Sequence, residues 1–129
     1  MTAFAAAHCR AMLAFVSIFA VLCAYSPAPA VAAGALAVGK CGAYGQAFDY
    51  PGEDSARAAA LKQCKGTCEA VTMKRACAAL SVDMANPCGA HGFAVASRIS
   101  NTLNAAMKKC YSFGGKECVI RAWACDAKG

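Results

Sequence analysis

The chain has 129 residues and ten cysteines, and its 13 Lys and Arg against 7 Asp and Glu give a net charge of +6. This length is enough for one domain, and the scattered basic residues, without interleaved aromatic residues, argue against a dedicated nucleic-acid binder. The sequence has no phosphate loop, no nucleophile elbow and no dinucleotide fingerprint, so we expect no cofactor.

Residues 1–33 have the pattern of a secretory signal peptide. Arg10 is the only charged residue before Lys40, and an apolar stretch follows it, then small residues, prolines and two Ala-x-Ala-like cleavage sites. A membrane anchor is the alternative, but a serine and two prolines end the apolar stretch before the roughly 20 residues that a span needs. We expect the mature chain to begin near Ala33 or Gly34, to be secreted or periplasmic, and to have no transmembrane span.

The mature chain opens with elements typical of an α+β fold. Residues 34–39 form a short apolar run between turn residues, and 43–49 alternate and contain Tyr and Phe, so both segments predict strands. Residues 55–64 are rich in alanine and follow the turn sequence YPGE, which predicts a helix with Asp54 as its N-cap. A β-prone run over 70–75 predicts a strand that closes this part of the chain.

The same kinds of element follow a second time. Residues 77–83 and 90–97 predict strands, and a helix with Ser100 as its N-cap comes next. Residues 119–124 predict the last strand, with Trp123 as a core or edge aromatic.

Two stretches, CGAYGQA and CGAHGFA, begin at Cys41 and Cys88 and indicate an internal repeat. The glycines of this motif would weaken a plain strand, so they predict a bulge or the close approach of another backbone. We therefore predict a single domain over 34–129, built from a tandem ββαβ repeat over 34–76 and 77–125 and a short C-terminal tail. Its two Ala-rich helices are expected to pack on one antiparallel or mixed sheet, stapled by disulfides.

The cysteines of the mature chain predict disulfides. Eight of the ten remain once the predicted signal peptide is removed, and an even number in a short exported chain is typical of a disulfide framework. Their spacing, with a single histidine in the mature chain, does not fit a zinc site, so we expect no metal. The eight residues are Cys41, Cys64, Cys68, Cys77, Cys88, Cys110, Cys118 and Cys125.

The predicted topology orders these cysteines along the sheet. The strands before and after each helix should run in the same direction, which places the cysteines at two opposite ends. We favour the pairs Cys64–Cys68, Cys110–Cys118, Cys77–Cys125 and Cys41–Cys88. The alternative closes each half separately, with two disulfides among its own four cysteines.

With these motifs in order, the chain resembles the domain-of-unknown-function family 4189, which consists of small exported bacterial proteins. The stretches that carry the resemblance are GALAVG, AYGQA, ARAAALKQC, CEAVTM, CAALSV, AHGFAVA, AAMKKC and CVIRAWAC. The chain departs from the family pattern at His91 and Phe93, where Tyr or Trp is more usual, and Cys41 and Cys88 are additional to six usual cysteines. The resemblance implies an exported location and a fold, and it implies no activity.

His91 is the weak candidate for catalysis, because it is the only histidine after the predicted signal peptide. It occupies the place of Tyr44 in the first half, which favours a partly exposed strand residue instead. We therefore expect a non-catalytic binding domain. The alternatives are a small secreted hydrolase that uses His91 with an acidic partner, and a structural envelope protein. Asp49 and Asp83 could form a carboxylate pair in space, although nothing in their spacing requires it.

The expected partner is a protein or an envelope component, with weak contact to anionic surfaces, because the charge is mildly basic and scattered. Aromatic residues near the predicted loops are candidate anchors for such a contact, and packing beneath the loops is their alternative role. These residues are Phe48, Tyr50, Tyr111 and Phe113.

Overall fold

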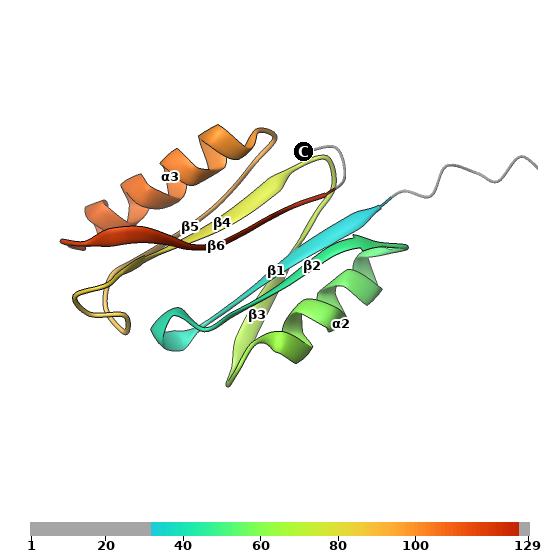
Figure 1. Ribbon diagram of the computed structural model, residues 1–129, viewed down its shortest axis with the longest axis horizontal. Coiled ribbons are helices and arrows are strands. Elements are labelled where there is room, and N and C mark those ends of the chain that lie inside the picture. Colours follow the sequence, from blue (N-terminus) through green and yellow to red (C-terminus); the bar gives the residue numbers. More distant parts are fainter. Residues whose placement is uncertain (1–31, 127–129) are drawn as a thin grey trace, which may run out of the picture. The chain divides into compact units, whose positions relative to one another are not determined.

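The computed structural model describes residues 32–126, so the predicted signal peptide lies outside the described residues except at its last two positions. Figure 1 shows the helices and strands of the described part. In chain order they are β1 (Ala33–Gly39), η1 (Lys40–Gly42), β2 (Tyr44–Tyr50), α2 (Glu53–Gln63), β3 (Cys68–Met73), β4 (Cys77–Asp83), β5 (His91–Ala96), α3 (Ile99–Ser112) and β6 (Cys118–Cys125). The predicted α+β class is confirmed.

The strands form two antiparallel sheets of three strands each, with the orders β2–β1–β3 and β5–β4–β6. The prediction of one antiparallel or mixed sheet beneath both helices is wrong. The first strand of each sheet in chain order, β1 or β4, is the central strand. Both of its edges form hydrogen bonds with the other two strands of the same sheet. The two sheets therefore meet by packing their faces together.

Each sheet carries one helix on its outer face (Figure 1). The buried side of α2 consists of Ala56 and Ala60, and the buried side of α3 includes Thr102 and Ala106. Both helices pack on strand alanines, because small side chains on both surfaces allow a helix to lie close to a sheet. The strand alanines under the two helices include Ala35, Ala37 and Ala47 in the first sheet and Ala79 and Ala94 in the second.

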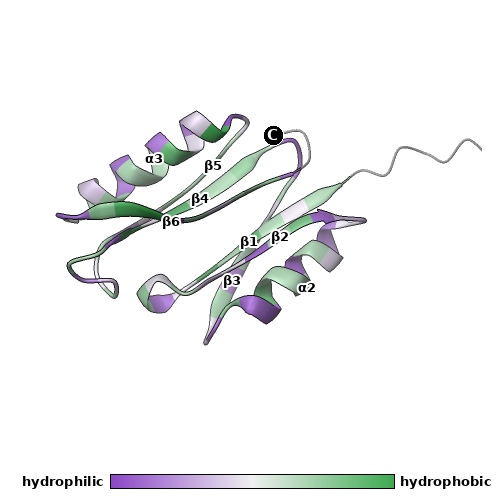
Figure 2. Cartoon of the chain, in the orientation of Figure 1, coloured by the Kyte–Doolittle hydropathy of each residue, from purple (hydrophilic) through white to green (hydrophobic). Residues whose placement is uncertain are grey.

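A third apolar cluster lies between the two sheets and contains the larger side chains. It joins Leu36 and Met73 of the first sheet to Leu80 and Val82 of the second, with Ala122 of β6 among them. Figure 2 shows apolar colouring along the central strands β1 and β4, which contribute to this cluster and also to the helix-facing clusters. The order of layers is therefore helix, sheet, sheet, helix.

Two glycines of the repeated motif allow the helices to approach. A Cβ atom at Gly45 would overlap the carbonyl oxygen of Ala60 on α2, and a Cβ atom at Gly92 would overlap that of Ala106 on α3. Of the two roles predicted for the motif glycines, these two positions serve the close approach of another backbone.

Both helices begin earlier than the sequence predicts. The N-cap residues are Gly52 for α2 and Arg98 for α3, and neither makes a side-chain capping hydrogen bond. The predicted N-caps Asp54 and Ser100 are wrong, because each lies inside the first turn. The start of α3 is held instead by Thr102, whose hydroxyl oxygen lies 2.9 Å from the carbonyl oxygen of Arg98 and 3.3 Å from that of Cys77.

Cations from the helices lie over the outer strands of the sheets. The guanidinium of Arg57 on α2 donates to the carbonyl oxygen of Ala70 on β3 at 2.7 Å, and the ammonium of Lys109 on α3 donates to that of Phe93 on β5 at 2.8 Å. β3 and β5 are each an edge strand of their sheet. Within residues 32–126, no helix is both long enough and apolar enough to span a membrane.

Candidate functional site

Four disulfides link the described residues. They are Cys41–Cys88, Cys64–Cys68, Cys77–Cys125 and Cys110–Cys118. Two of them join the end of a helix to the strand that follows, and a third joins β4 to β6 within one sheet. The Cys41–Cys88 disulfide differs, because it joins η1 of the first half to the loop before β5 in the second.

The same disulfide is also the most exposed one. Cys41 and Cys88 are both exposed to solvent. Each of the other three disulfides described has at least one buried partner. These buried cysteines are Cys64, Cys77, Cys110 and Cys118, with exposed fractions of 8%, 0%, 0% and 4%.

A cavity of about 280 Å³ lies beside the Cys41–Cys88 disulfide. Both halves of the chain line it, the first through Gly39, Lys40, Cys41 and Gly42, and the second through Leu80, Val82, Cys88 and His91. The cavity therefore lies where the turn after β1 meets the inner face of the second sheet.

The chemistry of the lining is apolar at the bottom and basic at the rim. Leu80 and Val82 are each 1% exposed and belong to the cluster between the sheets, whereas Lys40 and His91 are exposed. None of the described residues that line the cavity is acidic. The arrangement can hold a small apolar group below an anionic one.

The turn that forms the first wall has an unusual backbone. Cys41 has a φ of 55° and Gly42 a φ of 74°, so two consecutive residues adopt the left-handed conformation. This conformation is unfavourable for residues other than glycine, and Cys41 is held in it within a turn that the disulfide connects to Cys88.

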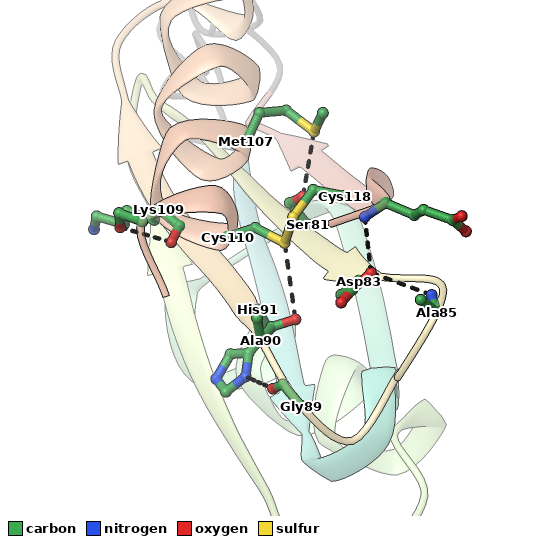
Figure 3. Close-up of a disulfide and its surroundings, with 12 residues drawn as sticks. Ser81, Asp83, Ala85, Gly89, Ala90, His91, Met107, Lys109, Cys110 and Cys118 are labelled. Carbon is green, nitrogen blue, oxygen red and sulfur yellow. Dashed lines mark hydrogen bonds between the residues drawn. A yellow bond between two sulfur atoms is a disulfide. The ribbon is translucent and has the colours of Figure 1, made fainter. Parts of the chain in front are cut away.

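His91 is the first residue of β5, and its Nδ1 atom lies 3.2 Å from the carbonyl oxygen of Gly89. When Nδ1 carries the proton it donates to that oxygen, and Nε2 remains available as an acceptor. In Figure 3 the ring of His91 and the carboxylate of Asp83 point away from each other. The structure therefore does not pair His91 with Asp83.

Asp83 has a different role, which sequence reasoning missed. One of its carboxylate oxygens accepts hydrogen bonds from the backbone N–H groups of Glu117 at 2.9 Å and of Ala85 at 3.2 Å (Figure 3). The hydrogen bond from Glu117 is the main reason why the pKa of Asp83 lies below its usual value. The carboxylate thus connects the loop after β4 to the loop before β6.

The predicted aromatic anchors do not gather at the cavity. Phe48, Tyr111 and Phe113 are exposed, while Tyr50 is half-buried and packs against the cluster beneath α2. None of these residues lines the cavity. Trp123 is exposed on β6, an edge strand of its sheet. Of the core and edge positions predicted for this residue, it therefore occupies the edge position.

Sequence reasoning also missed the contact between the outer strands β2 and β6. The guanidinium of Arg121 lies 5.6 Å from the centre of the Tyr44 ring, within the range of a cation–π interaction. The side-chain amide of Gln46 donates to the carbonyl oxygen of Trp123 at 2.6 Å. Each contact joins a strand of one sheet to a strand of the other, and strand alternation alone gives no signal for such pairs.

Metal ligands do not gather anywhere in residues 32–126, where no group of three or more His, Cys, Asp or Glu side chains is placed to hold an ion. A family model described as "Domain of unknown function (DUF4189)" matches residues 33–125, from the first residue of β1 to the last residue of β6. Neither the curated proteins nor the solved structures contain a match to this chain.

Proposed function

The chain belongs to the family described as domain of unknown function DUF4189, and we propose that it is an exported binding domain that takes a small amphipathic anion into the cavity beside Cys41–Cys88. The observation that carries this proposal is the lining of the cavity. Buried Leu80 and Val82 offer an apolar surface, and Lys40 offers a positive charge without an acidic residue beside it in the lining.

The size of the cavity narrows the class of ligand. Pockets for drug-sized ligands measure roughly 300–1,000 Å³. A cavity of about 280 Å³ lies just below that range. The fitting ligand has a short apolar chain and one anionic head group, whose charge lies near the ammonium of Lys40.

Export is the second part of the proposal. We propose that the signal peptide is cut after Ala32, one residue before the end of the predicted range 1–33, and that the mature protein is secreted or periplasmic. The first residue of β1 is Ala33, only 3% exposed, and cleavage after Ala32 leaves this strand whole. Four disulfides favour an oxidising compartment, because disulfides rarely persist in the bacterial cytosol.

The internal repeat is the third part. We propose that 34–76 and 77–125 are two copies of one ββαβ unit. In support, both halves place their first strand at the centre of a three-stranded sheet. The approach of a helix carbonyl to a motif glycine also occurs once in each half, at Gly45 and at Gly92.

A titration with six-carbon probes tests the binding proposal. Hexanoate should bind the oxidised protein saturably, and hexylammonium and hexanol should bind more weakly. Lys40→Met should weaken hexanoate binding by about two- to fivefold, as expected for an exposed ion pair worth up to about 1 kcal/mol. Isothermal titration calorimetry measures each affinity.

Lys62→Met is the matched control, because Lys62 is an exposed lysine on α2 that does not line the cavity. Equal affinity for hexylammonium and hexanoate, or an unchanged affinity in Lys40→Met, contradicts the proposal. Turnover of an ester or nucleic-acid substrate that disappears in His91→Ala would replace it with the hydrolase alternative, and the absence of any saturable ligand would favour a structural envelope protein.

A further inference from the structure

We infer that the Cys41–Cys88 disulfide is a thiol-exchange site, which low-molecular-weight thiols attack before the other three described disulfides and whose reduction opens the cavity. The first half of this inference stands on the structure alone. The second half rests on the proposed ligand cavity. Three observations carry it: the exposure of the disulfide, the space beside it and its position between the two halves.

Access to the sulfur atoms controls the rate of thiol–disulfide exchange. Both Cys41 and Cys88 are exposed, and both line the cavity, which leaves room for an incoming thiolate beside the disulfide. Two other disulfides are packed against a backbone. A Cβ atom at Gly39 would lie 2.7 Å from the Sγ atom of Cys68, and a Cβ atom at Gly115 would overlap that of Cys118.

The charges near the disulfide favour its reaction. Lys40 precedes Cys41 in the chain and lines the same cavity, and no acidic residue is among the described lining residues. A nearby cation stabilises a thiolate and thus makes it a better leaving group. We therefore assign Cys41 as the leaving sulfur and Cys88 as the sulfur that is attacked.

The exchange proceeds in two balanced steps. In the first, the thiolate of a low-molecular-weight thiol bonds to Sγ of Cys88, and the electron pair of the broken S–S bond leaves with Sγ of Cys41 as a thiolate. In the second, another thiolate attacks the mixed disulfide, releases Cys88 as a thiolate, and forms the disulfide of the small thiol. Two small thiols are oxidised, the protein disulfide gains two electrons, and water supplies protons to both cysteines.

Reduction at this position has a local consequence. Among the described disulfides, Cys41–Cys88 alone joins the two halves, while the cluster between the sheets contains neither cysteine. Breaking it leaves Leu36 and Leu80 packed but frees the turn at Cys41 and Gly42 to leave its left-handed conformation. This turn is one wall of the cavity, so reduction should abolish the ligand site. The core between the sheets should stay folded.

Stepwise reduction tests the exchange site. The oxidised protein is exposed to increasing 2-mercaptoethanol, quenched with a thiol-alkylating reagent, and mapped by peptide mass spectrometry. Cys41 and Cys88 should be alkylated at least about tenfold faster than the other cysteines, and a mixed disulfide on Cys88 should appear early. Earlier or simultaneous alkylation of Cys64 and Cys68, or of any other described pair, overturns the inference.

Two paired variants serve as controls. The double variant Cys41→Ser with Cys88→Ser should lose the fast phase, and Cys64→Ser with Cys68→Ser should retain it. If either variant fails to fold, the alkylation order in the unaltered protein still decides the question.

Hexanoate binding before and after selective reduction tests the opening of the cavity. The protein alkylated only at Cys41 and Cys88 should bind hexanoate at least about tenfold more weakly than the oxidised protein, a difference of about 1.4 kcal/mol. Unchanged affinity overturns this half of the inference. An oxidised protein that never binds hexanoate refutes the proposed function, whereas the alkylation order separately decides the exchange site.

Discussion

Gly45 and Gly92 each lie where a helix carbonyl oxygen occupies the space of a side chain. Neither residue has a Cβ atom, so the backbone of the strand can touch the backbone of the helix. β2 meets α2 in this way, and β5 meets α3. This contact explains why a glycine recurs at the same place in CGAYGQA and CGAHGFA. The sequence could suggest the close approach, because glycine inside a strand has few other uses.

Gly45→Ala and Gly92→Ala should each lower the free energy of unfolding by about 3 kcal/mol, the upper end of the usual cost of overpacking. The added methyl group meets a carbonyl oxygen of a helix, so the whole helix must shift. Urea unfolding of the oxidised proteins measures the change.

Gly52→Ala is the control for both variants. The nearest atom to a Cβ at Gly52 is the hydroxyl oxygen of Ser55 at 4.0 Å, and its φ of −162° suits alanine. Because Gly52 is the N-cap of α2 and alanine is a poorer N-cap than glycine, the substitution should cost up to about 1 kcal/mol, well below the cost at Gly45 or Gly92. If Gly92→Ala proves as stable as Gly52→Ala, the helix does not lie as close to β5 as described.

At the scale of elements, two loops depend on one carboxylate. Asp83 ends β4 and accepts the N–H groups of Ala85 and Glu117, so the loop after β4 and the loop before β6 share an anchor. The lowered pKa means that folding favours the ionised form. This contribution is complete above the unfolded pKa of about 3.9 and is lost as the pH falls through the lower pKa of the folded state.

Asp83→Asn should therefore lower the melting temperature at pH 7, and the difference from the unaltered protein should shrink as the pH falls below about 4. The amide keeps the shape of the side chain but removes the charge that strengthens both hydrogen bonds. Thermal unfolding of both proteins between pH 7 and pH 2.5 measures the difference. A difference that stays constant across this range would show that the charge of Asp83 does not act through these hydrogen bonds.

The elements themselves were partly predictable. The mainly apolar run over 77–83 gives the bounds of β4, because a strand that is buried along its length consists mostly of apolar residues. The helix starts were not, because α2 and α3 use no side-chain cap, and Asp54 and Ser100 only resemble caps. Neither the division into two sheets nor the cavity has a local signal. The first depends on which strands pair, and the second is lined by residues far apart in sequence, such as Lys40 and Val82.

At the scale of the whole molecule, the described core is built largely from alanine. Only a few larger side chains are fully buried, among them Leu36, Met73, Leu80 and Val82. Alanine buries little apolar surface, so the hydrophobic contribution per residue is small. Each disulfide contributes about 2–4 kcal/mol, and four together approach the whole stability of a typical small domain, about 5–15 kcal/mol.

Reduction of all the disulfides should therefore unfold the protein at 25 °C. Circular dichroism and urea unfolding of the oxidised and the fully reduced, alkylated forms measure the loss. Intact mass before and after reduction gives the number of protons gained, which should be eight, and tests whether the exported protein begins at Ala33. A reduced protein that still unfolds cooperatively at the same urea concentration contradicts this account.

Arg57 and Lys109, which lie over the edge strands β3 and β5, affect how two molecules of this protein can associate. A foreign strand that adds to β3 or β5 needs the outward carbonyl groups, and those of Ala70 and Phe93 already accept from Arg57 and Lys109. An incoming strand must displace a charged group from its acceptor before it can extend the sheet. Growth of fibrils from these two edge strands is therefore disfavoured, even at high protein concentration.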